Sequence, residues 1–421
     1  MARFLYNLAL LALLPYVWLH LFLRSRKQPE YLEHLGERFG RYAAAPLQPL
    51  IWLHAVSVGE TRAAAPIVAA LKARYPGHRI LLTHMTPTGR RASEELFGDG
   101  VERVYLPYDY PFAVQRFLAH FRPAVGVIME TELWPNLVAA CKAGGIPLLL
   151  ANARLSEKSA RRYARFPNLT RAALGGLAAI AAQTEQDAAR LRALGAPQVE
   201  VLGNVKFDIL PPPEQLALGE GLRQGMGPRP VLLAASTREG EEALLFEALA
   251  RRPLGDALLV VVPRHPQRFD EVAALAAKAG FAVQRRSENA PVAAQMQVLL
   301  GDSMGEMFAY YAACDVAFVG GSLLDYGSQN LIEPCAVGRP VLIGSSTYNF
   351  SHAAEQALEC GAARQIGSAG ELLDAAAELL RDAAARRRMG EAGKAFAAHH
   401  RGATAKTVEL IESRLASRPT A

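Results

Sequence analysis

Short apolar runs alternate with longer amphipathic stretches along most of the chain. From about residue 50, the apolar runs have the length of strands, at Leu50–Val56, Arg79–Thr83, Val101–Leu106, Ala124–Met129, Ile146–Leu150, Ala178–Gln183 and Val199–Leu202. Helical stretches such as Glu60–Tyr75 and Leu133–Ala143 separate them. Alternation of this kind predicts a parallel sheet with helices on both faces.

The alternation breaks once and then restarts. Pro211-Pro212-Pro213 and the stretch Gly225–Pro230 are typical of a connection rather than a core. A second series of predicted strands follows, at Val231–Ala235, Ala257–Val262, Phe281–Gln284, Gln297–Leu300, Val316–Val319 and Pro340–Ile343, and an Ala-rich helical tail runs from about Leu372 to Leu415. We therefore expect an α/β protein with two Rossmann-like lobes and a ligand cleft between them, at the carboxyl ends of the strands.

The N-terminal segment is almost entirely apolar. Residues Phe4–Leu23 are interrupted only by Asn7, Pro15 and His20, and Arg24, Arg26 and Lys27 follow directly. About 20 apolar residues can span a bilayer core. Because no signal-peptide cleavage site is evident and the charges follow the apolar run, we expect a membrane anchor with the rest of the chain in the cytoplasm. A helix embedded in one leaflet stays open as an alternative to a spanning one, and a buried core helix is the competing interpretation.

Composition and charge narrow the classes of partner. The 421 residues are 51% hydrophobic and 20% charged, with a net charge of +6, so a packed core and an anionic partner are both expected. The charge is dispersed rather than gathered with aromatic residues, which argues against nucleic acid. The cysteines at 141, 314, 335 and 360 lack zinc-ligand spacing. We expect small buried thiols and no metal.

Candidate chemistry in the first lobe follows the strands. The string His54-Ala55-Val56-Ser57-Val58-Gly59-Glu60 places a carboxylate at a helix N-terminus, where it either faces the cleft or only complements the helix dipole. Another predicted strand is followed by Glu130-Thr131-Glu132-Leu133-Trp134-Pro135-Asn136. The purely structural interpretation of this string is an acidic region at a helix N-cap. The basic stretch with Arg154, Lys158, Arg161, Arg162 and Arg165 is either a solvated helix face or a phosphate site.

The second lobe carries four further strings, all at strand ends. They are Ser236-Thr237-Arg238-Glu239-Gly240-Glu241-Glu242, Val262-Pro263-Arg264-His265-Pro266, Asp302-Ser303-Met304-Gly305-Glu306-Met307, and Gly320-Gly321-Ser322 with Gly327-Ser328-Gln329-Asn330-Leu331-Ile332-Glu333-Pro334. Amides at such ends suit a phosphate, and a carboxylate suits ribose hydroxyls. The P-loop pattern GxxxxGK[ST] is absent, as is GxGxxG after a first strand, which argues against P-loop and dinucleotide enzymes.

Taken together, these strings resemble the 3-deoxy-manno-octulosonic acid (Kdo) transferases of lipid A maturation. The resemblance covers nearly the whole chain and includes HAVSVGE, ETELWPN, NARLSEKS, GNVKFD around Lys206, VPRHPQRF and DSMGEM. It implies a GT-B fold and an inverting, metal-independent transfer of Kdo from CMP-Kdo to a lipid A precursor, lipid IVA, on the cytoplasmic side of the bacterial inner membrane. It also implies no cofactor, contact with inner membrane lipids, and Glu60 as the general base.

The resemblance sorts the other candidates into two groups. Acceptor binding or support of the base falls to Ser57, Gly59, Glu130, Glu132, Arg154 and Arg161. Donor binding falls to Lys206, Ser236, Thr237, Arg238, Arg264, His265, Pro266, Met304, Gly305, Glu306, Gly321, Ser322, Asn330 and Glu333. Arg238 departs from the family pattern, which often has His there, as does Gly-Ser-Gln-Asn at 327–330, where the family often has Gly-Gly-His-Asn.

The expected organisation has five parts: an anchor (1–25), an acceptor-binding lobe (26–208), a linker (209–230), a nucleotide-sugar-binding lobe (231–395) and a C-terminal helix (396–421). Two rival functions remain. One is another GT-B enzyme with a UDP-sugar and a lipid-linked acceptor. The other, from a different class, is a membrane-tethered two-lobe solute-binding protein, which the charges at 24–27 oppose because it needs export.

Overall fold

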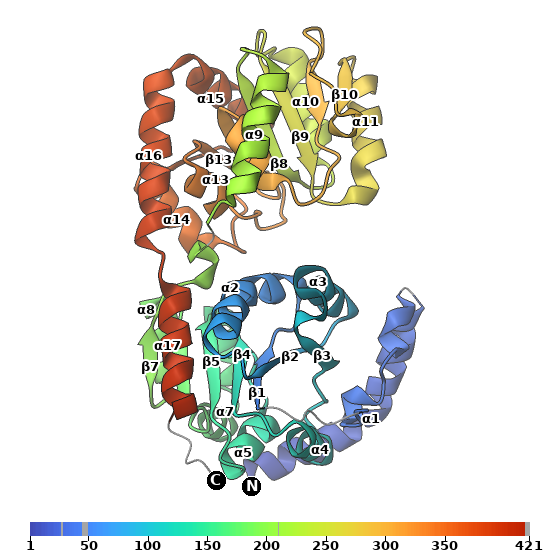
Figure 1. Cartoon of the computed structure of the whole chain (residues 1–421), viewed down its shortest axis with the longest axis vertical. Coiled ribbons are helices and arrows are strands. Elements are labelled where there is room, and N and C mark those ends of the chain that lie inside the picture. Colours follow the sequence, from blue (N-terminus) through green and yellow to red (C-terminus); the bar gives the residue numbers. More distant parts are fainter. Residues whose placement is uncertain (27, 44–48, 209, 417–421) are drawn as a thin grey trace. The chain divides into compact units, whose positions relative to one another are not determined.

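The computed structural model describes residues 1–26, 28–43, 49–208 and 210–416, and the chain divides into two compact units (Figure 1). The first unit comprises Met1–Asp208 with Arg401–Ala421, and the second comprises Ile209–His400. Three expectations fall partly outside the described residues: Lys27 of the basic cluster, residue 209 of the linker, and residues 417–421 of the tail.

A seven-stranded parallel sheet forms the centre of the first unit, in the order β3-β2-β1-β4-β5-β6-β7. Its strands are β1 (Leu50–His54), β2 (Arg79–His84), β3 (Glu102–Tyr105), β4 (Val125–Met129), β5 (Leu148–Ala153), β6 (Ala179–Ala182) and β7 (Val199–Val201). Its helices are α1 (Ala2–Ser25), α2 (Val58–Arg74), α3 (Pro87–Phe97), α4 (Pro111–Phe121), α5 (Pro135–Ala143), α6 (Glu157–Tyr163), α7 (Pro167–Leu174), α8 (Glu185–Ala193) and α17 (Ala403–Ala416). Short 3₁₀ turns lie at η1 (Pro29–Leu32), η2 (Glu37–Phe39), η3 (Gly98–Gly100) and η4 (Val205–Asp208).

Both faces of this sheet are covered, which explains why its strands are continuous apolar runs. Leu50 and Trp52 of β1 pack with α4, α5, α7 and α8. The alternate residues Ile51 and Leu53 pack with α2 and α17 on the other face. Gly126 of β4 lies beside Trp52, and a Cβ atom there would come within 2.6 Å of the indole ring. The glycine therefore makes room for the largest buried side chain in the sheet.

Helix α1 lies against the first unit along much of its length. The Tyr6 hydroxyl donates to Asp109 Oδ2 (3.0 Å), and the Tyr110 hydroxyl donates to the Leu10 carbonyl (3.0 Å). The Trp18 ring stacks on Phe39 with centroids 5.2 Å apart. By length and composition α1 could cross a membrane, and only 6% of its most apolar window is buried. The interpretation of this segment as a buried core helix is therefore wrong.

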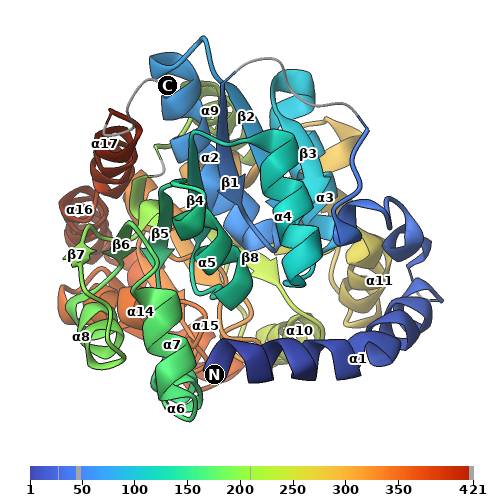
Figure 2. The ribbon, with the colours of Figure 1, turned by 90° about the horizontal axis from the view of Figure 1, so that it is seen from below.

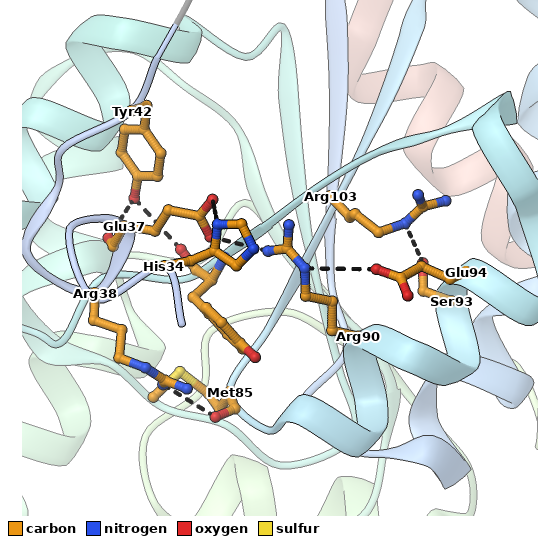
Figure 3. A network of polar contacts seen from close by, with 10 residues as sticks. His34, Glu37, Arg38, Tyr42, Met85, Arg90, Ser93, Glu94 and Arg103 are labelled. Atoms are coloured by element: carbon orange, nitrogen blue, oxygen red, sulfur yellow. Dashed lines mark hydrogen bonds and ion pairs between the residues drawn. The ribbon is translucent and has the colours of Figure 1, made fainter. Parts of the chain in front are cut away.

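The segment after α1 is fastened to the ends of β2 and β3 by a polar network (Figure 3). Glu37 Oε2 accepts from Arg90 Nη1 (3.0 Å) and from the Tyr105 amide (2.7 Å). Arg38, only 1% exposed, donates to the Met85 carbonyl (3.1 Å) and stacks over the Tyr105 ring at 3.9 Å. This network holds the connection between α1 and β1 against the sheet.

The second unit repeats the architecture, with the strand order β10-β11-β9-β8-β12-β13-β14 (Figure 1). Its strands are β8 (Val231–Thr237), β9 (Leu258–Pro263), β10 (Val283–Arg285), β11 (Val298–Leu300), β12 (Val316–Val319), β13 (Val341–Ile343) and β14 (Ala363–Gln365). Its helices are α9 (Pro213–Met226), α10 (Glu241–Arg251), α11 (Phe269–Lys278), α12 (Met307–Ala313), α13 (Ile332–Val337), α14 (Ser351–Glu359), α15 (Ala369–Arg381) and α16 (Ala383–His399), with 3₁₀ turns η5 (Pro266–Arg268) and η6 (Arg286–Glu288). Helices α10, α11 and α15 pack on one face, and α9 and α12 on the other.

The predicted fold class is confirmed, and several details differ. Residues 213–226, expected within a linker, form α9, which packs on α12 because Leu222 and Met226 face the apolar core. The tail divides between the units: α16 packs in the second, whereas α17 packs on α2 of the first. Asp208 accepts from the Gly402 and Thr404 amides at the start of α17, which secures the returning chain. Cys141, Cys314 and Cys335 are buried as expected, but Cys360, at the end of α14, is exposed.

Candidate active site

Two carboxylates of the first unit flank the point where its strand order reverses. Strand β1 lies between β2 and β4. Strands β2 and β3 continue the sheet on one side of the β1–β4 pair, and β5, β6 and β7 continue it on the other. Open α/β sheets bind ligands at such a point, outside the carboxyl ends of the strands. Glu60 follows β1 and Glu130 follows β4. The topology therefore brings both residues to the place where a ligand is expected.

Glu60 completes a capping box at the start of α2. Its Oε2 accepts from the Val56 amide (2.8 Å), its Oε1 accepts from the Ser57 hydroxyl (3.1 Å), and its own amide donates to Ser57 Oγ (3.4 Å). This local arrangement is the dipole-complementing role that the sequence left open. Gly59 lies exposed in the same turn.

The pKa of Glu60 is nevertheless raised, to about 7. Burial is the main cause, and the charges of Glu130 and Glu132 add to it, while the hydrogen bonds from Val56 and Ser57 act in the opposite direction. A carboxylate of this pKa is a far better proton acceptor near neutral pH than an ordinary one. Capping and proton transfer are thus compatible roles for the same side chain.

Glu130 is held in an unusual backbone conformation. Its φ of 61° is left-handed, as is the φ of 53° at Asn152 near the end of the neighbouring strand β5. For residues other than glycine, such conformations cost about 1–3 kcal/mol each and cluster at functional sites. Glu130 Oε1 lies 3.2 Å from Lys206 Nζ. Lys206, expected among the donor-binding residues, therefore lies in the first unit and pairs with a carboxylate there.

The loop after Glu130 is packed against the next strand end. The Thr131 hydroxyl donates to the Arg154 carbonyl, and the Tyr163 hydroxyl donates to the Thr131 carbonyl (3.2 Å). Burial raises the pKa of Glu132. Arg161 instead lies on the exposed surface of α6, where it pairs with Glu157. The structure brings Ser57, Glu60, Glu130, Glu132 and Lys206 together and leaves Arg161 apart from them.

Two buried histidines at this edge of the sheet were not among the site residues predicted from the sequence. His54 ends β1 and His84 ends β2, and both are fully buried. Burial lowers the pKa of His54 to about 3 and that of His84 to about 4, so both are neutral. The Nε2 atoms of both rings lack a hydrogen-bond partner among the described residues. His54 opens the HAVSVGE string, which was the available signal.

The second unit has its own reversal point, between β8 and β12, and a buried carboxylate joins the two strand ends. Glu241 accepts from the amides of Arg238 (2.8 Å), Gly321 (2.7 Å) and Leu323 (3.0 Å). The amides expected to hold a substrate anion after β8 and β12 therefore hold the protein's own carboxylate. Gly320 permits this approach, because a Cβ atom there would lie 2.7 Å from the Ser236 carbonyl oxygen.

Cations gather around the ends of β8 and β9. The guanidinium of Arg238 lies 4.6 Å over the Tyr326 ring and forms no ion pair with any residue that the structure describes. Burial and the charges of Arg238, Arg264 and Arg268 lower the pKa of the exposed His265, which places these side chains near one another. Arg268 is committed to Glu242 (2.7 Å). The cluster is suited to binding an anion.

The remaining donor candidates divide by exposure. Thr237 is buried and donates to Glu242 (2.7 Å), and Ser322 is fully buried, with its hydroxyl accepting from the Gly344 amide (2.8 Å), so both support the loops from within. Met304 is 59% exposed, and Pro266 at the start of η5 is exposed as well. Ser236 has a left-handed φ of 55°, and Gly305 one of 78°.

Two pairs of polar side chains lie near the nucleotide-suited strings. Glu306 Oε2 accepts from the Ser303 hydroxyl (2.6 Å) and lies 3.3 Å from Arg286 Nε. Asn330 Nδ2 donates to Glu333 Oε1 (3.1 Å) at the start of α13, and its Oδ1 accepts from the Ile332 amide (3.0 Å). Glu333 is thus held in a fixed orientation. Within the described ranges, the structure has no group of three or more His, Cys, Asp or Glu side chains that could hold a metal ion.

Comparisons with known proteins agree with this arrangement. The sequence model of a family described as 3-deoxy-D-manno-octulosonic-acid transferase (kdotransferase) matches residues 33–209, and that of the group 1 glycosyl transferases matches residues 276–396. The chain is 46% identical over 427 residues to the 3-deoxy-D-manno-octulosonic acid transferase of Bordetella pertussis, covering 98% of this chain and 99% of that protein. It is 39% identical over 383 residues to the Haemophilus influenzae protein of the same name, covering 89% of each.

Solved structures share the fold at low sequence identity. A glycosyltransferase from Rickettsia africae has a TM-score of 0.60 at 15% identity, covering 89% of this chain and 100% of that one. The Anabaena protein Alr3699/HepE in complex with UDP has a TM-score of 0.57 at 15% identity, covering 88% and 100%. At this identity the likeness establishes the two-unit architecture alone.

Proposed function

Because the chain belongs to the 3-deoxy-D-manno-octulosonic acid transferases, glycosyltransferases of lipopolysaccharide biosynthesis, we propose that it transfers Kdo from CMP-Kdo to the lipid A precursor lipid IVA. The site of action in this proposal is the cytoplasmic face of the inner membrane. The observation that carries the chemistry is Glu60, a half-buried carboxylate at the reversal point of the first sheet, with a pKa raised to about 7.

In the proposed reaction Glu60 is the general base. Its carboxylate takes the proton of the acceptor hydroxyl while that oxygen bonds to the anomeric carbon of Kdo. The bond between that carbon and the phosphate oxygen breaks, and CMP leaves with the electron pair. Attack from the face opposite the leaving group inverts the configuration. Glu130, paired with Lys206 at 3.2 Å, keeps a second negative charge near Glu60 and supports its basicity.

The donor is assigned to the second lobe. Arg238 and Arg264 supply positive charge for the phosphate of CMP, and the neutral ring of His265 supplies a hydrogen-bond donor. Glu333, oriented by Asn330, suits the ribose hydroxyls. Cationic side chains and oriented donors can stabilise a single-phosphate leaving group, so the proposed transfer needs neither a metal nor a cofactor. The cleft expected between the lobes stays a prediction.

Helix α1 is assigned to the inner membrane. Its outward side chains are exposed, including Phe4 (65%), Leu11 (56%) and Leu19 (54%), while Tyr6 and Trp18 contact the lobe. A helix held against its own lobe in this way cannot cross the bilayer alone. We therefore favour an interfacial helix with its apolar side in one leaflet. Deleting residues 1–23 should release most of the protein from inner-membrane vesicles, and full retention of the truncated protein would contradict this assignment.

The function itself is tested by incubating the purified protein with CMP-Kdo and lipid IVA and measuring the product masses. We expect Kdo-bearing lipid products and release of CMP. CMP, rather than UDP, should raise the thermal midpoint of the protein. Protection by UDP with no product from CMP-Kdo would instead support a UDP-sugar enzyme of the same fold.

A further inference from the structure

A hollow of about 320 Å³ opens on the first unit between the N-terminal end of α1, α5 and α7. Figure 2 shows this end of α1 beside α7, and the two helices are in contact. Small side chains of Ala139, Ala143 and Ala172 form much of the wall. Pro135, the first residue of α5, also lines the hollow, and it directly follows the loop that carries Glu130 and Glu132. The hollow therefore adjoins the candidate site loop from the outside of the lobe.

The rim of the hollow is cationic. Arg3 and Lys142 both line it and are both exposed. Neither forms an ion pair with any residue in the described part of the chain. An apolar wall with two cationic side chains at the rim suits an amphiphile whose polar end is anionic.

A basic helix leads into the same surface. Lys158, Arg161, Arg162 and Arg165 line an open depression of about 420 Å³ on and just after α6, with Glu157 as the one acidic residue among them. Only three residues separate α6 from α7, and one of them, Phe166, is 64% exposed. Positive charge beside an exposed aromatic ring is typical of a surface that meets anionic lipid headgroups.

The apolar side of α1 supplies the third element. Phe4 (65% exposed), Leu5 (59%) and Leu8 (48%) continue from the residues that line the hollow. The hollow thus opens at the border between an apolar surface and a basic one. A hydrocarbon chain reaches such a place directly from the apolar phase. A wholly polar ligand would instead bury polar groups against the alanine wall, where they find no hydrogen-bond partners.

We propose that this hollow binds one acyl chain of the phosphorylated glycolipid acceptor, with an acceptor phosphate held by Arg3, Lys142 and the basic helix. The identity of the acceptor rests on the function proposed above. The volume lies at the lower end of the usual range for small-molecule pockets, about 300–1,000 Å³, which suits one chain, and the alanine wall favours that chain over the sugar headgroup. The chain would anchor the acceptor beside the loop of Glu130 and Glu132.

The test is a double variant that fills the hollow, Ala143→Leu with Ala172→Leu. Both alanines are exposed, so the larger side chains enter the hollow without disturbing the core. The matched control is Ala189→Leu, at an exposed position of α8 that does not line the hollow. Equilibrium binding of radiolabelled lipid IVA in detergent micelles without donor is measured first, and KM values for lipid IVA and CMP-Kdo second. Thermal midpoints confirm that all proteins are folded.

The double variant should bind lipid IVA about tenfold more weakly, equivalent to about 1.4 kcal/mol, and raise its KM similarly. The KM for CMP-Kdo should stay unchanged, and Ala189→Leu should match the wild type. Unchanged lipid binding in the double variant overturns the proposal, as does a loss confined to binding of plain phospholipid vesicles. Failure of the wild type to transfer Kdo would refute the proposed function separately, because the binding measurement needs no turnover.

Discussion

Glu60 and Glu241 occupy matching places in the two lobes. Each follows the first strand of its sheet, β1 or β8, and each lies in the first turn of the next helix. Burial raises the pKa of both carboxyl groups. Their surroundings nevertheless differ. Glu60 is partly accessible and is held by one amide and one hydroxyl from its own turn, whereas Glu241 is 1% exposed and accepts three amides from two loops.

The difference fits the catalytic role proposed for Glu60 and a structural role for Glu241. Glu241 is saturated by amides that join the ends of β8 and β12, so it has no role left for a ligand. Glu60 has neighbouring carboxylates, Glu130 and Glu132, whose charges raise its pKa, and it is only partly buried. A shared position in a repeated fold therefore does not imply a shared role, because the role depends on which partners the carboxylate has.

The largest effect is expected at Glu60. Glu60→Gln keeps the shape and one acceptor oxygen for the cap but removes the basicity, so turnover should fall by about 10²–10⁴-fold. CMP affinity, measured by calorimetry on the same preparation, should hardly change. Near-normal turnover would remove Glu60 from the mechanism and promote Glu130 or Glu132. Loss of both turnover and CMP binding would indicate that Glu60 only maintains the fold, as Glu241 does.

At Glu241 the expected effect is on stability instead. Glu241→Ala leaves three buried amides without an acceptor, and the free energy of unfolding of the second lobe should fall by roughly 2–4 kcal/mol. Chemical denaturation followed by far-UV circular dichroism measures the change, because the tryptophans at 18, 52 and 134 all lie in the first unit and their fluorescence would not report on the second. Glu241→Gln, which keeps one acceptor oxygen, should show a smaller loss. A fully stable Glu241→Ala protein would break the distinction between the two carboxylates.

A smaller effect is expected at Glu333, in the lobe assigned to the donor. Glu333→Ala should weaken CMP binding by about 1–3 kcal/mol, because a ribose hydroxyl loses its acceptor. Glu333→Gln is the isosteric control and should retain part of the affinity. Turnover at saturating CMP-Kdo should fall much less than in Glu60→Gln. Unchanged CMP affinity in Glu333→Ala would move the nucleotide site to another part of the chain.

Sequence patterns predicted the architecture well where strands were buried on both faces. Strand β14 was missed because its three residues, Ala363–Gln365, include an exposed Arg and Gln and lack an apolar run. Helix α9 was not predicted because the three prolines at 211–213 indicated a linker, although Pro in the first turn is compatible with a helix. That α17 returns to the first lobe depends on tertiary packing and on Asp208, which no local pattern reveals.

The candidate site was predictable only as a set of strand ends. Periodicity indicated that Glu60 and Glu130 follow β1 and β4, but not that these strands are neighbours at the reversal point. The Lys206–Glu130 pair joins residues 76 positions apart, and Glu241 bridges to a loop 80 positions away. The left-handed backbone of Glu130, Asn152 and Ser236 is likewise set by the folded chain, because nothing in these residue types requires it.

The most direct test of the account is the pH dependence of single-turnover Kdo transfer by the wild type and by Glu60→Gln. Since burial raises the pKa of Glu60 to about 7, the base is protonated below that pH and ionised above it. The wild-type rate should rise about tenfold per pH unit up to about pH 7 and then level off. The residual rate of Glu60→Gln should lack this limb. The same limb in Glu60→Gln would contradict the account and assign the titration to another group, such as Asp109, whose pKa burial raises to about 6.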